Sequence, residues 1–231
     1  MNRMRALVMH EARLQFRYGI YYAYAFVIMF YITVIFTLGD SIPGWLAGLI
    51  IFSDPAAVGF FFLGALMLLE KSEGVRAALA VTPLSASGYF WAKCITLTSM
   101  ACLAVIAVSL GLHESVNYWW LIPVVALTSV QYLALGVPIV RLFSTVTSYM
   151  MGAAFLLIPV VLPAIFALKD PMPLWAMFFP AAAQLKLIFV ATGYGSASAG
   201  QIALMFAICA LSAVLCVVWA LRNLRTELGQ K

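Results

Sequence analysis

Residues 70–93 read EKSEGVRAALAVTPLSASGYFWAK, a charged, proline-interrupted segment between two long apolar runs. Ser72 is a favourable N-cap residue, and the alanine-rich run after it has high helix propensity. Thr82-Pro83 ends this helix, because the residue before a proline is disfavoured in the helical conformation. We therefore expect a short helix over residues 72–80.

This short helix has two different sides. Val75, Ala78 and Leu79 fall together at spacings of three and four residues, whereas Glu73 and Arg76 point away from them. A short amphipathic helix in water cannot bury its own apolar side. We expect another protein to cover it.

The composition of the whole chain indicates a polytopic membrane protein. The 231 residues are 65% hydrophobic and 9% charged, with a mean hydropathy of +1.06, far outside the usual composition of soluble domains. No stretch is polar enough to form a soluble domain, so we expect a single membrane domain over residues 1–231. The net charge of +5 is dispersed along the chain, which argues against a nucleic-acid partner.

Six apolar runs reach the length of about 20 residues that a spanning helix requires, and we expect an all-α integral membrane fold. They cover residues 18–38, 45–69, 91–112, 118–140, 149–168 and 201–221. An even number of spans places both termini on one side of the lipid bilayer. That side receives 11 of the 13 basic residues, while only Lys169 and Lys186 remain for the other side. The positive-inside rule therefore predicts a plasma-membrane protein whose termini and 70–93 loop are cytoplasmic.

Two segments lie outside these spans. Residues 1–17 gather most basic side chains on one arc of a helical wheel, which predicts an interfacial helix on the cytoplasmic leaflet. Glu11 and Gln15 interrupt its apolar side, so a basic tail is the alternative. Residues 169–200 are too long for a turn and too apolar for a solvated loop, which favours outer re-entrant helices over a seventh span.

Polar groups inside the spans are costly and often functional. Ser53-Asp54-Pro55 is typical of a helix start, with a capping side chain before proline, so Asp54 either caps a helix or lines a substrate route, and the two roles are compatible. Most other polar and large apolar residues in spans bond or pack between helices. The candidates for a substrate route are Asp54, Phe61, Thr128, Gln131 and Met151.

The sequence has no recognisable catalytic or cofactor-binding motif. A GxxxxGK[ST] phosphate loop, HExxH and GxSxG are absent, and the four cysteines lie within apolar runs without metal-site spacing. We expect no catalytic residue, metal or cofactor in this chain. If ATP drives the protein, another chain must bind the ATP and its Mg²⁺.

Two pairs of motifs suggest a family. Residues 70–74, EKSEG, end the second span, and residues 81–85, VTPLS, precede an aromatic-rich segment that ends at Lys93. This pattern resembles the permeases of type-2 ABC exporters. Residues 52–55, FSDP, and 59–62, GFFF, further resemble the branch of fluoroquinolone-type drug export permeases.

The resemblance covers the whole chain and implies the permease subunit of an ATP-driven exporter of apolar or amphiphilic drug-like molecules. Two permeases, identical or homologous, would pair around a central route, and two copies of a separate ABC ATPase subunit would dock below them. Residues 72–80 would form the coupling helix. Its ATPase-docking residues would be Ser72, Glu73, Val75, Arg76, Ala78 and Leu79.

Other classes of protein are less compatible with the sequence. A secondary, ion-coupled transporter would need several intramembrane carboxylates or histidines, and the spans offer Asp54 alone. A membrane enzyme would need paired carboxylates or a histidine cluster. A non-transporting membrane scaffold remains an alternative, which an adjacent gene for a soluble ATPase would argue against.

Overall fold

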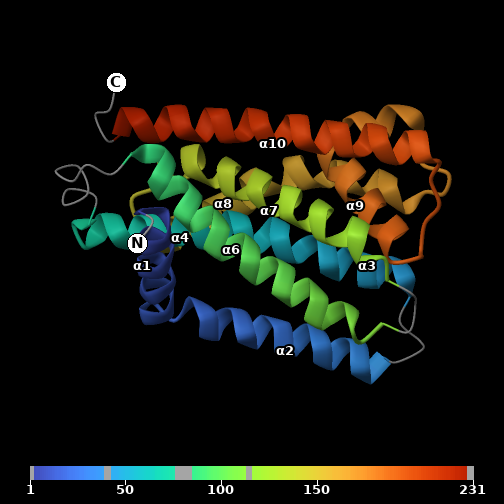
Figure 1. The fold of residues 1–231 in the computed structure, drawn as a ribbon, viewed down its shortest axis with the longest axis horizontal. Coiled ribbons are helices and arrows are strands. Elements are labelled where there is room, and N and C mark those ends of the chain that lie inside the picture. The colour runs from blue at the N-terminus through green and yellow to red at the C-terminus, as the bar shows by residue number, and fades with distance from the viewer. Residues whose placement is uncertain (1–2, 39–42, 76–84, 113–115, 228–231) are drawn as a thin grey trace.

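The computed structural model describes residues 3–38, 43–75, 85–112 and 116–227, and this part of the chain contains helices and no strand (Figure 1). The elements are α1 (Arg3–Arg17), α2 (Ile20–Leu38), α3 (Gly44–Ser53), the π-helix η2 (Asp54–Val58), α4 (Gly59–Ser72), α6 (Ala86–Ser109), α7 (Tyr118–Val140), α8 (Val146–Val161), the 3-10 helices η3 (Leu162–Leu168) and η4 (Leu174–Phe178), α9 (Pro180–Ala191) and α10 (Ala199–Glu227).

Six helical segments in this part of the chain are long and apolar enough to cross a membrane. They are Ile20–Thr37, Gly44–Ser72, Ala86–Ser109, Tyr118–Val140, Val146–Leu168 and Ala199–Glu227. Each coincides with one predicted span, which confirms the all-α membrane fold. The third span begins five residues earlier than predicted, because Ser85 caps α6 by accepting a hydrogen bond from the backbone N–H of Gly88.

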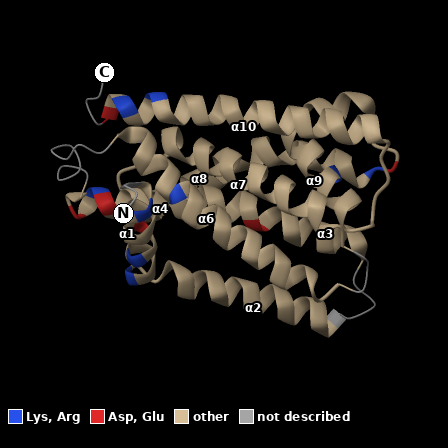
Figure 2. Cartoon of the chain, in the orientation of Figure 1, with Lys and Arg blue, Asp and Glu red and all other residues tan. Residues whose placement is uncertain are grey.

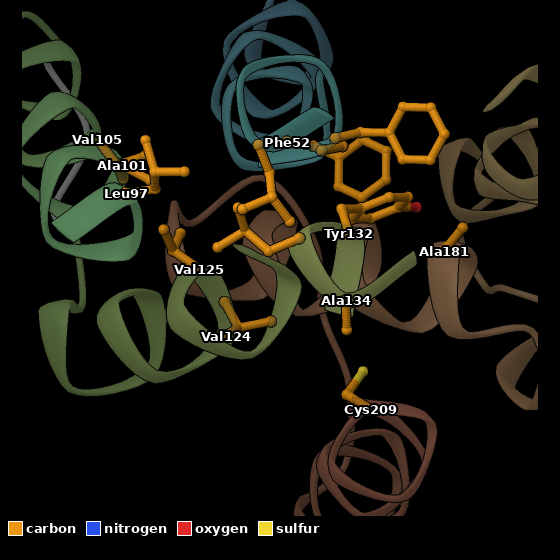
Figure 3. Close-up of a cluster of buried hydrophobic side chains, with 14 of the residues drawn as sticks. Phe52, Leu97, Ala101, Val105, Val124, Val125, Tyr132, Ala134, Ala181 and Cys209 are labelled. Atoms are coloured by element: carbon orange, nitrogen blue, oxygen red, sulfur yellow. The ribbon is translucent and has the colours of Figure 1, made fainter. Parts of the chain in front are cut away.

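Helix α7 lies at the centre of the bundle. It packs against α4, α6, α9 and α10. Figure 3 shows its side chains Val124, Val125 and Tyr132 among labelled residues of α3, α6, α9 and α10. Tyr132 is fully buried and meets Phe52 of α3 edge-on, with ring centroids 6.4 Å apart. By contrast, in the spans formed by α2, by α8 with η3, and by α10, only 17% of the residues in the most apolar stretch are buried. Such exposure is expected of helices that face lipid or another subunit.

The second span is continuous where a helix start was predicted at Ser53-Asp54-Pro55. Asp54 has helical dihedral angles and Ser53 makes no side-chain cap, so the capping interpretation is wrong. Proline lacks an N–H and its ring clashes with the carbonyl four residues earlier. The wider turn of η2 accommodates this clash without ending the helix.

Helix α1 lies across one end of the bundle, roughly perpendicular to the spans, and α10 ends at the same end (Figure 1). Gly19, with a φ of +75°, makes the turn between α1 and α2. Figure 2 shows that the described basic residues gather at this end, whereas the opposite end carries few. The basic residues are therefore sorted between the two ends as predicted.

Between η3 and α10 the chain folds back into the opposite end of the bundle. The N–H of Asn117, just before α7, donates to the carbonyl of Ala191 at the end of α9 (2.8 Å), and Gln184 earlier in α9 reaches Gln131 in mid-α7. Helix α9 therefore runs from the bundle interior back to that end. With 12 residues it is too short to span a bilayer, so the seventh-span alternative is wrong, while the re-entrant position in the membrane stays a prediction.

Candidate functional site

A buried cluster of charges lies where α1 crosses the bundle. The ammonium of Lys93 in α6 donates to Glu11 Oε1 in α1 (2.6 Å) and to Glu70 Oε1 at the end of α4. All three residues are at least 95% buried. One lysine thus joins three helices that are far apart in the sequence.

Uncharged groups complete this Lys93 cluster. The Tyr89 hydroxyl donates to the second oxygen of Glu70, and the Gln15 amide donates to Thr96 Oγ1 (2.7 Å). Lys93 also lies 4.7 Å from the centroid of the Tyr89 ring. A charge buried away from water is tolerated only when it is paired and hydrogen-bonded, and this cluster meets that condition.

The sequence did not reveal this cluster. Glu11 and Gln15 were expected to interrupt the apolar side of α1, but both are the buried side chains that attach α1 to the bundle. Lys93 counted only as a basic residue that sets topology. The available signal was a complementary pair, Glu70 and Lys93, at the two ends of the loop predicted to dock a partner.

The predicted docking segment begins differently from the prediction. Ser72 is the last residue of α4 and its hydroxyl donates to the Leu69 carbonyl (2.8 Å), so it does not start a new helix. Gly74, with a φ of +72°, follows α4 in a turn, and the backbone is helical again at Val75. A positive φ ends a helix readily only at glycine, so α4 ends before Gly74 and the backbone becomes helical again only after it. The remaining residues of this prediction, Arg76, Ala78 and Leu79, lie outside the described residues.

Glu73 also connects the docking segment to α1. It accepts a hydrogen bond from the Tyr18 hydroxyl (2.7 Å), at the turn between α1 and α2. Burial and this hydrogen bond to Glu73 raise the pKa of Tyr18 to about 12, so the hydroxyl remains a donor at neutral pH. Glu73 is exposed, as predicted for the polar side, and the structure adds Tyr18 as its hydrogen-bond partner.

Asp54 lies deep in the second span. Its exposed fraction is only 3%, and its Oδ2 accepts a hydrogen bond from the Tyr24 hydroxyl of α2 (2.5 Å). Its Oδ1 has no hydrogen-bond partner among the described residues. Such a carboxyl group is costly in a membrane, which keeps a functional role for Asp54 open as a prediction.

Among the described residues, none of the other route candidates forms a hydrogen bond with Asp54. Thr128 is fully buried and its hydroxyl donates to the Val124 carbonyl of its own helix (2.7 Å). Gln131 accepts hydrogen bonds from Gln184 of α9 (2.8 Å) and Ser212 of α10 (2.7 Å), a bonding role between helices. Met151 is 68% exposed on α8, and Phe61 is partly buried against the core. Their roles in a route stay predictions.

An apolar cavity of about 560 Å³ lies beside η2. Its walls are residues of α3 and η2 on one side and of α8 and η3 on the other, among them Phe52, Ala56, Leu157 and Ile165. Pockets of roughly 300 to 1,000 Å³ with apolar walls commonly hold small molecules. Ser53, which precedes Asp54 in the sequence, and Ala56, two residues after it, line this cavity.

The described residues include no group of three or more histidine, cysteine, aspartate or glutamate side chains placed to hold a metal ion. Cys94 and Cys209 are buried, Cys102 and Cys216 are half-buried, and all four are unpaired. They fill space between helices as small apolar residues do.

Comparisons with known proteins place the chain in a family. A family model described as the fluoroquinolones export permease protein family matches residues 2–226. Fluoroquinolones export permease proteins from two strains of Mycobacterium tuberculosis, CDC 1551 / Oshkosh and ATCC 25618 / H37Rv, are each 26% identical over 183 residues, which cover 78% of this chain and 73% of the relative. No solved structure matches the chain. Because the family model spans nearly the whole sequence, the chain belongs to the fluoroquinolones export permease protein family.

Proposed function

We propose that this chain is the membrane-spanning permease of an ATP-driven exporter, which moves apolar or amphiphilic drug-like molecules such as fluoroquinolones outward across the plasma membrane. The family supports the export of drugs, and the resemblance to type-2 ABC exporters supports the ATP-driven step. Two copies of a separate ATPase subunit supply hydrolysis. A second permease, identical or homologous, completes the translocation route.

The observation that carries the mechanism is the Lys93 cluster. Glu70 and Lys93 flank the docking segment on its two sides and are joined to each other and to Glu11 of α1. A displacement of residues 73–85 by the ATPase therefore moves the ends of α4 and α6 together with α1. A packed, buried joint transmits such a movement as a unit, because close-packed groups cannot deform independently.

The apolar residues Val75 and Leu79 supply the contact with the ATPase. Full burial of each side chain contributes roughly 1.5 to 3 kcal/mol. A helix over these residues would bring the two, which are four positions apart in the sequence, onto one side. We place them in a cleft of the ATPase, with both termini and the docking segment on the cytoplasmic side.

A double substitution tests this function. The Val75→Asp, Leu79→Asp variant should lose co-purification with the proposed ATPase subunit, and inside-out vesicles should lose ATP-dependent uptake of a fluorescent fluoroquinolone. Lys71→Ala is the matched control, because Lys71 is exposed in the last turn of α4, and it should retain both activities.

Three results would contradict the proposal. If the double variant still binds the ATPase at wild-type stoichiometry, residues 72–80 are only a loop. If vesicles take up the drug without ATP when a proton gradient is imposed, the chain is a secondary transporter. If no drug is transported under either condition, the scaffold alternative gains support.

A further inference from the structure

A second cavity lies at the end of the bundle opposite to α1, between the start of α10 and the chain on either side of η4. Its volume is about 320 Å³. Its polar lining includes Asp170, Lys186 and Gln201, and its apolar lining includes Met172, Met177 and Met205. It is separate from the apolar cavity beside η2, with which it shares no lining residue.

Lys186 is the unusual member of this lining. Its side chain is only 4% exposed, and its ammonium lies 3.1 Å from Oδ1 of Asp170, whose side chain is 49% exposed. An ammonium carries three N–H donors, and Asp170 is its one hydrogen-bond partner among the described residues. A buried cation thus has donors to spare and is paired with an anion that water can reach.

The rest of the cavity suits an anion with an apolar body. Ser198 and Gln201 belong to the first turn of α10 and its cap, where each backbone N–H is bonded to the other's side chain. The positive end of the helix dipole therefore adds to the field of Lys186. The three methionines are buried, with exposed fractions of 5% or less, and flexible thioether side chains adapt to apolar surfaces of different shapes.

We propose that this cavity binds a small organic carboxylate with an apolar body, which replaces Asp170 at the Lys186 ammonium. Asp170 already shows that a carboxylate fits this position, and its exposure allows it to turn into water when the ligand enters. Release reverses the exchange, because Asp170 returns to the lysine and displaces the bound anion.

The role of this site rests on the proposed function. The cavity lies at the end of the bundle opposite to the docking segment, which in an exporter is the side of release. An internal carboxylate that competes for the lysine keeps binding weak, and weak binding favours release. The binding itself needs neither the ATPase nor transport.

Binding of 2-naphthoate to the purified chain in lipid nanodiscs tests the proposal, with the neutral, nearly isosteric 2-naphthamide as the matched ligand. Equilibrium dialysis against empty nanodiscs corrects for partition into lipid. The naphthoate should bind at least about tenfold more tightly than the amide, as expected for a hydrogen bond to a charged group. Asp170→Asn should tighten naphthoate binding by a similar factor, and Lys186→Gln should abolish the preference for the acid.

Several results would overturn it. Equal binding of the acid and the amide, or no change in either variant, would make Lys186–Asp170 a structural ion pair only. Retention of anionic phospholipid that depends on Lys186, without naphthoate binding, would assign the site to a lipid headgroup. If Lys186→Gln fails to fold, the Asp170→Asn variant alone tests the proposal. Asp170 is half-exposed, so its substitution should leave the fold intact. Naphthoate binding without ATP-driven transport would leave this site intact and reject the exporter.

Discussion

Single residues decide how the segment after α4 is attached to the bundle, and Lys93 matters most among them. It is the cation paired with two buried carboxylates from different helices, Glu11 and Glu70. Losing the lysine alone leaves both carboxylates buried without their cation. Removing one partner of a buried ion pair destabilises a protein far more than replacing all partners with uncharged residues.

We therefore predict that Lys93→Met destabilises the protein by about 3 to 5 kcal/mol. The triple variant Glu11→Gln, Glu70→Gln, Lys93→Met should be much less destabilised, because it removes the charges together. Thermal unfolding in detergent measures both. If the single and triple variants melted at the same temperature, the cluster would contribute packing and not charge compensation.

At the scale of elements, the packing of α4 against α8 depends on a glycine. A Cβ on Gly64 would overlap the ring of Tyr149. This ring cannot move aside easily, because it is fully buried and its hydroxyl donates to the Phe60 carbonyl (2.6 Å). The two helices approach closely only because position 64 has no side chain, as is common between membrane helices.

Gly64→Ala should therefore destabilise the protein by about 1 to 3 kcal/mol, the usual cost of overpacking. The matched control is Gly200→Ala, where a Cβ would meet open space and where alanine favours the helix. Tyr149→Leu should partly rescue Gly64→Ala in a double-mutant cycle. Equal unfolding temperatures for Gly64→Ala and Gly200→Ala would show that α4 and α8 separate more readily than the structure indicates.

The elements that sequence could predict are those encoded locally. Spans follow from runs of apolar residues, so all six were found, and the short helices before α10 followed from the length and apolarity of residues 169–200. Contacts between distant polar residues could not be predicted. Glu11 and Lys93 are 82 positions apart and Tyr24 and Asp54 are 30 apart, and no local pattern pairs them. The helix-start pattern at Asp54 failed because the surrounding span held the helix together through a π turn.

At the scale of the whole molecule, the direction of insertion determines which cavity faces the cytoplasm. Figure 2 shows most of the described basic residues at the end of the bundle where α1 lies and α10 ends, and few at the opposite end. An excess of basic residues retains its end of the bundle in the cytoplasm. The docking segment would then face the ATPase, and the carboxylate site would face outward.

Single cysteines test this orientation in a variant whose four native cysteines are replaced by alanine. A membrane-impermeant maleimide added to intact cells should label Ser196→Cys, because Ser196 is exposed at the Lys186 cavity, which is predicted to face outward. It should leave Gln230→Cys, near the C-terminus, unlabelled until the cells are permeabilised, when both should react. Labelling of Gln230→Cys alone in intact cells would show that the protein is inserted in the opposite orientation. No cytoplasmic ATPase could then reach Val75, and the 11 to 2 distribution of basic residues would have failed as a guide to the insertion of this protein.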